Sequence, residues 1–257
     1  MQKAANHADS AAIRLHQEGH TTAAIGLLDH AIASDPQNGS AWLVRAIIRH
    51  SQAEWRLALA DAEMAMTLLP LPTGGQLVLA DCYSHLNHHE LAVVGYQHLL
   101  AQEDLPTDIY AGLYAGFRRC GRSDLALQAC RASVAKEPEN HAAHFGMAHC
   151  MAALNYSAVY IAGVLRTASK LAPDNAVYRT SLAIQLVRAG LPSDAYQELS
   201  QVACRDLLSI ECRCSARKLM QLCVWANDAE RASALGQVIT KLSSNDRGQP
   251  GIKGSKR

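Results

Sequence analysis

The phrase KEPEN occupies residues 136–140, and two similar phrases occur elsewhere: SDPQN at residues 34–38 and LAPDN at residues 171–175. Their prolines define a period. Pro138 follows Pro36 by 102 residues, which is three times 34, and Pro70 lies one period after Pro36. Pro173 follows Pro138 by 35 residues. A repeat of this length indicates a chain built from stacked copies of one small unit.

Within each period, residues of one kind recur at the same place. Small residues form a column made of Ala24, Ala58, Ala92 and Ala126. Five residues earlier in each period lie Gly19, Ala53, Asn87 and Gly121. Gly and Asn most readily end a helix in the left-handed conformation, and proline cannot donate to a continuing helix. Each period therefore predicts a helix, a turn, a second helix and a proline-containing link.

These features resemble the tetratricopeptide repeat (TPR) family, through Trp42, Tyr83, Tyr96, Gly19 and Gly121 together with the alanine column and the prolines. The resemblance implies an all-α fold, a right-handed α-solenoid of stacked antiparallel helix pairs, or TPR-like superhelix. The predicted repeats are 5–38, 39–72, 73–106, 107–140, 141–175, 176–209 and a degenerate 211–242, which together make one solenoid over 1–242. Residues 203–215 break the period, and residues 243–257 are predicted to be a disordered basic tail.

The composition favours a helical protein without extreme charge. Of the 257 residues, 49% are hydrophobic but only 5% aromatic, so we expect a core of aliphatic side chains. The net charge of +1 provides no global field that would attract nucleic acid or a membrane surface. We find no long apolar run and no secretory signal at the start, and we expect no membrane insertion. The eight cysteines are then expected as free thiols in the cytoplasm.

No catalytic or cofactor motif is present in the sequence, so we predict a protein that is not an enzyme and needs no cofactor or metal. The HHE stretch at residues 88–90 lacks the second histidine of a zinc-protease helix, because position 93 is valine. The late cysteines are Cys204, Cys212, Cys214 and Cys223. Their spacing fits paired zinc ligands poorly, and we interpret them as helix-core residues. A structural metal site at these cysteines is the alternative.

The resemblance implies that the first helix of each hairpin lines a concave groove for a peptide or protein partner. Helical spacing then selects twelve candidate partner-binding residues: His16, Leu43, Ile47, His50, Leu77, Asp81, His85, Arg118, Arg119, Phe145, His149 and Arg188. The middle of this surface, which also includes Ile13, is apolar, and one edge is cationic when its histidines are protonated. Such a surface suits a peptide with apolar anchors and a few carboxylates. The competing interpretation is that these side chains are ordinary solvated helix ends.

We therefore predict a protein-interaction scaffold or adaptor. The alternative is a structural module that self-assembles into a homo-oligomer or a larger complex. An apolar set near the C-terminal end of the array motivates this alternative: Val224, Trp225, Leu235 and Val238. A third hypothesis is an accessory domain of an enzyme or of a metal-dependent protein that uses the late cysteines.

Overall fold

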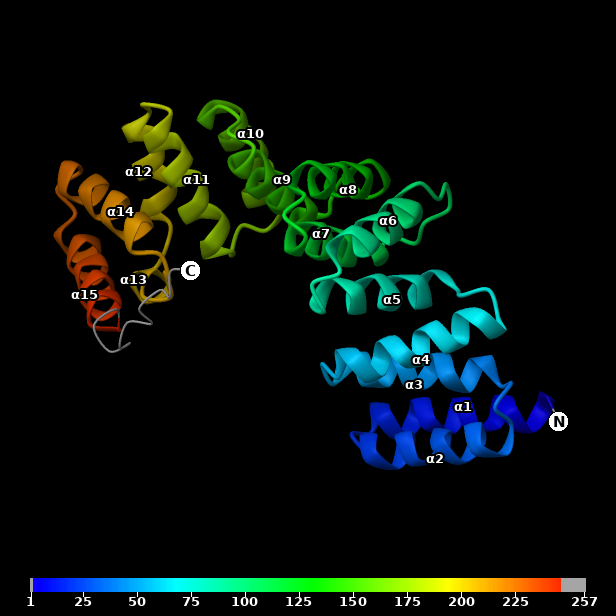
Figure 1. Ribbon diagram of the computed structural model, residues 1–257. Coiled ribbons are helices and arrows are strands. Elements are labelled where there is room, and N and C mark those ends of the chain that lie inside the picture. The colour runs from blue at the N-terminus through cyan, green and yellow to red at the C-terminus, as the bar shows by residue number, and fades with distance from the viewer. Residues whose placement is uncertain (1, 246–257) are drawn as a thin grey trace, which may run out of the picture. The chain divides into compact units, whose positions relative to one another are not determined.

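The computed structural model describes residues 2–245, and every regular element in this range is a helix. In chain order the helices are α1 (Gln2–Gln17), α2 (Thr21–Ser34), α3 (Gly39–Ser51), α4 (Trp55–Leu68), α5 (Thr73–His85), α6 (His89–Leu100), α7 (Ile109–Arg119), α8 (Ser123–Lys136), α9 (His141–Ala153), α10 (Ala158–Leu171), α11 (Ala176–Arg188), α12 (Pro192–Ser200), α13 (Cys204–Leu207), α14 (Arg213–Trp225) and α15 (Ala229–Asn245) (Figure 1). The prediction of an all-α fold is confirmed. Helix pairs α1–α2 to α9–α10 correspond in order to the first five predicted repeats.

The helices form two compact units, divided between Lys136 and Glu137. Unit 1 holds α1–α8, and unit 2 holds α9–α15. In unit 1, α1 contacts α3, α3 contacts α5 and α5 contacts α7, so these four helices form a layer that we call the odd-helix layer. The helices α2, α4 and α6 each pack on their own partner and on the next odd-numbered helix. In unit 2, α11 packs against α10, α12 and α14. The single solenoid over residues 1–242 stays a prediction.

The turn inside each hairpin contains one residue with a left-handed backbone, as predicted. Positive φ angles occur at Gly19, Ala53, Asn87, Gly121, Asn155, Gly190 and Asn227. The alanine column is confirmed as core, because all four of its alanines are completely buried. Small side chains at these positions let the two helices of a hairpin and the next hairpin approach closely.

The three phrases that reveal the period also begin the next helix. The last asparagine of each phrase, Asn38, Asn140 or Asn175, accepts a hydrogen bond from a backbone N–H in the first turn that follows. The proline carbonyl oxygen bonds a side chain six residues later. These contacts are Trp42 Nε1 to Pro36 at 3.0 Å, His144 Nε2 to Pro138 at 2.9 Å and Arg179 Nε to Pro173 at 2.9 Å. Each phrase thus satisfies backbone groups on both sides of a helix start.

Residues 203–215 depart from the repeat because the short helix α13 is inserted between α12 and α14. Helix α13 packs on α15, and its Leu207 is fully buried. Helix α15 continues to Asn245, so the helical array ends beyond residue 242. The rest of the predicted basic tail, residues 246–257, lies outside the described residues. No helix of the described chain is long and apolar enough to cross a membrane.

Candidate functional site

The candidate groove residues lie on two separate units. Nine of them are on the odd-helix layer of unit 1. The other three, Phe145, His149 and Arg188, are on α9 and α11 of unit 2. Each unit therefore presents its own candidate surface.

Asp81 on α5 gathers polar side chains from three neighbouring helices of unit 1. Its Oδ2 atom lies 3.2 Å from His50 Nε2, and its Oδ1 atom accepts hydrogen bonds from the Tyr96 hydroxyl at 2.6 Å and from Arg119 Nη1 at 3.2 Å. Arg119 also donates to the buried Ser84 hydroxyl at 3.3 Å. We call these five residues the Asp81 cluster. The structure thus brings together three residues that the sequence analysis selected, His50, Asp81 and Arg119.

Tyr96 is the member of the Asp81 cluster that sequence reasoning missed as a functional residue. Its ring is completely buried, and it packs edge-on against Phe117 with 5.4 Å between centroids. A buried tyrosine hydroxyl needs a hydrogen-bond partner, and that requirement was the available signal. The carboxylate of Asp81 meets it.

The Asp81 cluster balances its own charge. Burial alone would raise the pKa of Asp81, but hydrogen bonds from His50 and Tyr96 and the positive charge of Arg119 outweigh burial and lower the pKa. The ionised carboxylate is therefore favoured and neutralises Arg119. His50 and Arg119, which were predicted to form part of a cationic edge, instead contact Asp81 within the protein.

The predicted histidines are held in contacts of their own. His85 stacks on Trp55 with 3.7 Å between ring centroids, and His50 meets the same indole edge-on at 5.1 Å. Burial and the charge of Arg119 lower the pKa of His85, so its neutral form is favoured. His16 Nε2 lies 3.2 Å from the hydroxyl of Ser51 on α3. His85 therefore adds little positive charge to the surface at neutral pH.

Ile13, Ile47 and Arg118 are exposed on the odd-helix layer. Ile13 on α1 is 43% exposed, and Ile47 on α3 is 41% exposed. Arg118 on α7 is exposed and lies over the ring of Tyr114, 5.6 Å from its centroid, while its Nη1 donates to the Tyr114 hydroxyl at 3.2 Å. This surface therefore combines apolar side chains with one oriented cation.

Leu43 is a correction to the predicted groove, because it is a core residue. It is only 8% exposed and packs with Ala65 and Leu71. The cause is Gly75 in the next hairpin: a Cβ atom there would lie 2.9 Å from Leu43 Cδ1, so the absent side chain leaves room for the leucine. Leu77, one period after Leu43, is half-buried.

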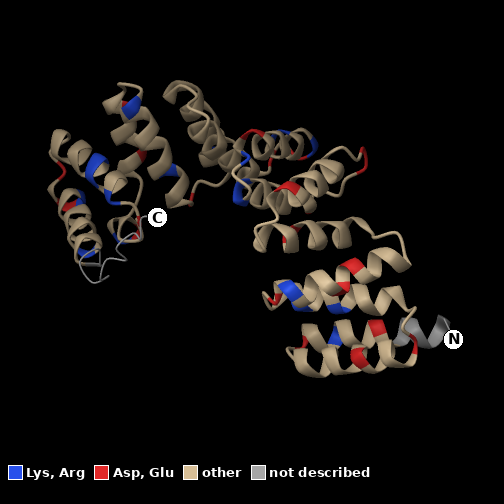
Figure 2. Ribbon diagram, viewed as in Figure 1, with Lys and Arg blue, Asp and Glu red and all other residues tan. Residues whose placement is uncertain are grey.

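A second charged group, also missed from sequence, joins α2, α3 and α4. Acidic and basic residues occur together on these helices (Figure 2). Arg45 donates through two nitrogens to the buried Asp61, at 2.9 Å and 2.7 Å, and also contacts Asp29. Arg49 adds a bond to Asp61 at 2.8 Å. The guanidinium of Arg45 also lies over the ring of Trp42, 4.7 Å from its centroid. These contacts lie between helices, and we assign them to stability.

In unit 2, one of the three predicted residues, Phe145, packs against Tyr178. Phe145 stacks on the Tyr178 ring with 4.6 Å between centroids, and His141 Nδ1 lies 3.0 Å from its hydroxyl. His149 and Arg188 are exposed on α9 and α11. Phe145 is half-buried by this packing, so it offers a partner only part of its ring.

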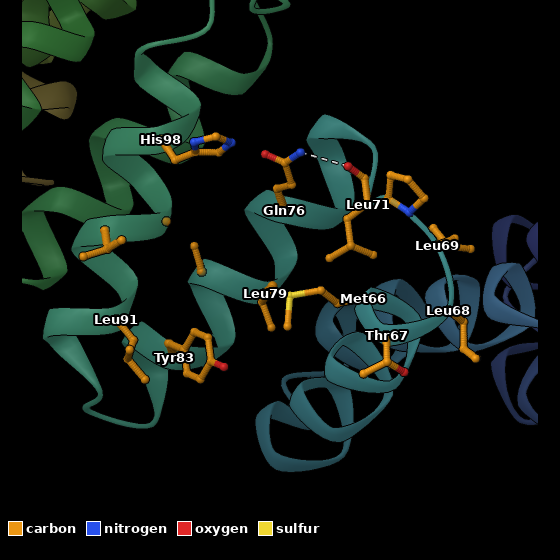
Figure 3. Close-up of a pocket in the computed structure, with 14 residues that line it drawn as sticks. Met66, Thr67, Leu68, Leu69, Leu71, Gln76, Leu79, Tyr83, Leu91 and His98 are labelled. Carbon is orange, nitrogen blue, oxygen red and sulfur yellow. Dashed lines mark hydrogen bonds between the residues drawn. The ribbon is translucent and has the colours of Figure 1, made fainter.

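A cavity of unit 1 lies between α4, α5 and α6, and sequence reasoning did not find it. It has a volume of about 680 Å³, and apolar side chains such as Met66, Leu79 and Leu91 line it (Figure 3). Its floor is narrow because Gly95 lets α6 approach α5: a Cβ atom there would lie 3.0 Å from that of Ala80. Polar groups mark its ends, with Gln76 and His98 at one end and Tyr83 at the other (Figure 3). Its wall residues Leu91 and Val94 are exposed, and the sequence alone does not indicate this exposure.

The apolar set proposed for self-association is divided by the structure. Val224 and Trp225, at the end of α14, are 66% and 57% exposed. Leu235 and Val238 are instead buried in the core, which corrects their expected exposure. Within residues 2–245, no three His, Cys, Asp or Glu side chains are placed to hold a metal ion.

Antiparallel helix pairs with a left-handed residue inside each hairpin and a period near 34 residues define a TPR-like repeat protein. No protein-family model matches the sequence, and no curated protein matches it. Among solved structures, the chain is similar to the C-terminal part of a TPR repeat-containing protein from Cytophaga hutchinsonii, with a TM-score of 0.71 at 15% identity over 94% of this chain and 100% of that one.

Two further similarities support the same fold. YrrB, described as a TPR protein with an unusual peptide-binding site, matches with a TM-score of 0.56 at 16% identity over 68% of this chain and 89% of its own. MamA matches with a TM-score of 0.58 at 15% identity over 69% of this chain and 97% of its own. The chain therefore has the all-α TPR fold.

Proposed function

We propose that the protein is a non-catalytic adaptor whose odd-helix layer binds an extended peptide. The observation that carries this proposal is the exposure of Ile13 and Ile47 on neighbouring helices, with the guanidinium of Arg118 on the same layer. Large apolar side chains on adjacent helices can hold apolar anchors, and a guanidinium pairs well with a carboxylate. The peptide-binding site named for YrrB supports a function of this kind.

The spacing of the helices suggests the pattern of the peptide. Neighbouring packed helices lie about 8–10 Å apart, and an extended chain advances about 3.3 Å per residue. Anchors on Ile13 and Ile47 would then be about three residues apart in the peptide. Arg118 lies two helices beyond Ile47, so its carboxylate partner would follow about six residues later.

The Asp81 cluster holds together helices that carry this surface. It ties α3, α5, α6 and α7 together, so the peptide would meet a preformed layer and little ordering free energy would be lost on binding. The cluster also neutralises Arg119, and Arg118 is the cation that would meet the carboxylate of the peptide. A cytoplasmic location is part of the proposal and agrees with eight cysteines that are all thiols.

The test is a selection from a phage-displayed library of random twelve-residue peptides on the purified full chain. Enriched peptides are then measured by fluorescence anisotropy against Ile47→Asp, Arg118→Glu and, as the matched control on the cavity wall, Val94→Asp. We expect Ile47→Asp to weaken binding at least tenfold, about 1.4 kcal/mol. Arg118→Glu should weaken only acidic peptides. We vary Arg118 alone because a change at Arg119 would also break the Asp81 cluster.

Two outcomes would overturn the proposal. If Val94→Asp abolishes binding and Ile47→Asp does not, the peptide occupies the cavity between α4, α5 and α6. If no peptide is enriched, the odd-helix layer does not recognise extended peptides.

Self-association is the second candidate function, and the exposure of Val224 and Trp225 favours it. Sedimentation velocity over a hundredfold range of concentration tests it. We expect a self-associating chain to gain mass with concentration and the Trp225→Ser variant to remain a monomer. A wild-type monomer at every concentration would eliminate this candidate.

A further inference from the structure

The eight cysteines occupy very different environments. Cys212 and Cys214 are the two that are exposed, whereas the other six are buried or half-buried. Cys212 is the residue at the N-cap of α14, and Cys214 lies in the first turn of the same helix. The two cysteines therefore lie on the surface of unit 2 and are separated by one residue.

The surroundings of this pair are basic. Both cysteines line a hollow of about 660 Å³, with the cations of Arg213, Arg217 and Lys218 and the single carboxylate of Glu211. Positive charge stabilises a thiolate and attracts anions. The hollow thus favours the nucleophilic form of a cysteine and the approach of a negatively charged reactant.

The surroundings of Cys212 favour its thiolate form. Hydrogen bonds from the side chain and backbone of Ser215 lower the pKa of Cys212, and the charge of Lys218 contributes. The thiolate is the reactive form in exchange with disulfides.

The neighbouring cysteines have the opposite chemistry. Burial and the carboxylate of Glu230, which lies 3.5 Å from the Cys204 sulfur, raise the pKa of Cys204. Burial and the charge of Asp228 raise the pKa of Cys223 to about 11. These two residues keep their protons at neutral pH and serve as internal comparisons.

We propose that Cys212 and Cys214 form a redox-active dithiol that exchanges with small disulfides carrying carboxylates. The Cys212 thiolate attacks one sulfur of the small disulfide, a new S–S bond forms, and one small thiolate leaves. The Cys214 thiol then loses its proton to solvent and attacks the Cys212 sulfur. The second small thiol leaves, and a Cys212–Cys214 disulfide remains. The two cysteines are oxidised by two electrons, and the small disulfide is reduced to two thiols.

The spacing permits this closure. Residues two apart at the start of a helix have Cα atoms about 5–6 Å apart, within the roughly 4.4–6.8 Å that disulfides span. Cys212 has an extended backbone, with φ −104° and ψ 114°, so it lies outside the regular turn that would constrain its side chain. A mixed disulfide at Cys212 can therefore be resolved within the same chain.

The experiment treats the reduced full chain with oxidised glutathione, which carries carboxylates, and in parallel with cystamine, a cationic disulfide of similar reactivity. Peptide mass spectrometry follows each cysteine over time. In the wild type we expect loss of two hydrogens from the peptide that holds both cysteines. In Cys214→Ser we expect a stable glutathione adduct on Cys212. In Cys212→Ser, Cys214 should react at least tenfold more slowly.

Two further variants test why Cys212 reacts and why it prefers a disulfide that carries carboxylates. Ser215→Ala should slow the reaction of Cys212 about threefold, because the loss of thiolate is only partly offset by the greater nucleophilicity of a more basic thiolate. Arg217→Gln combined with Lys218→Gln should remove the preference for glutathione over cystamine. Circular dichroism checks that each variant keeps its helix content.

Three results would overturn the proposal. One is equal rates at Cys204 and Cys212. Another is an unchanged rate at Cys214 when Cys212 is serine. The last is a wild-type chain that stops at the mixed disulfide, which would show that Cys214 does not resolve it.

Discussion

Gly116 on α7 is the position at which the addition of one methyl group should lower the stability of the protein most. A Cβ atom added there would lie less than 3.0 Å from the ring carbons and the hydroxyl oxygen of Tyr96. The Tyr96 ring is completely buried and packs against Phe117, so it has no free space to enter. In Gly116→Ala the ring must therefore move, and its hydroxyl must leave Asp81.

The magnitude follows from three contributions. Overpacking a core costs about 1–3 kcal/mol. Losing a hydrogen bond to a charged group costs about 1.5–3 kcal/mol. Replacing glycine by alanine inside a helix stabilises the helix by about 1 kcal/mol. We expect Gly116→Ala to lower the free energy of unfolding by about 2–5 kcal/mol.

Gly112 provides a matched control on the same helix. A Cβ atom there would lie 2.7 Å from Cδ2 of Leu77, which is the far end of a flexible side chain that can turn away. Gly112→Ala should therefore gain most of the helix propensity and raise stability by up to about 1 kcal/mol.

Urea unfolding followed by far-UV circular dichroism measures both variants. A double-mutant cycle with Tyr96→Phe isolates the contribution of the tyrosine hydroxyl. When the hydroxyl is absent, the loss of stability caused by Gly116→Ala should be smaller by the hydrogen-bond contribution. The reasoning would be refuted if Gly116→Ala were as stable as Gly112→Ala. Strict additivity of Gly116→Ala and Tyr96→Phe would refute the link to Asp81.

Three further changes have defined outcomes. Ala53→Gly should stabilise the chain by about 1 kcal/mol, seen as a higher Tm, because Ala53 holds a φ of 59° that costs little only for glycine. Asp61→Ala should cost about 3–5 kcal/mol in urea unfolding, because it leaves Arg45 and Arg49 without their buried acceptor; a loss below about 1 kcal/mol would contradict this. Asp81→Asn should reduce the pH dependence of stability, measured by urea unfolding between about pH 7 and pH 3. The pKa of Asp81 is lowered on folding, so its stabilisation is complete above the unfolded value of about 3.9 and is lost as pH falls through the folded value. An unchanged acid profile in the variant would contradict this reasoning.

The fold could be predicted from the sequence because its signals are local and repeated. The turn position holds glycine, asparagine or alanine, which indicates the backbone angle there. The core column holds alanine, which indicates the separation of the helices. Both signals depend on residue type alone. The insertion of α13 could not be predicted in the same way. It breaks the period, and its buried Leu207 is indistinguishable in sequence from any other apolar residue.

The candidate site was harder to predict because it depends on contacts between repeats. Leu43 and Leu77 occupy the same place in consecutive repeats, yet only Leu43 is fully buried. The difference lies in Gly75, a residue in the following hairpin. Helical periodicity gives the direction of a side chain from its own axis, but its exposure depends on the size of residues one period away.

Asp81 shows how one substitution within a column changes the character of a surface. Ile47 and Ile13 occupy the same column one and two periods earlier, respectively, and both are exposed apolar side chains. An aspartate at the third place requires compensation because it is partly buried, and His50, Tyr96 and Arg119 supply it from three helices. The same column therefore presents apolar side chains for contact on α1 and α3. On α5 it instead holds an aspartate whose polar contacts are within the protein. In a repeat protein of this kind, recognition and rigidity can be divided between successive copies of one position, so the residues to vary for binding are those that their neighbours leave exposed.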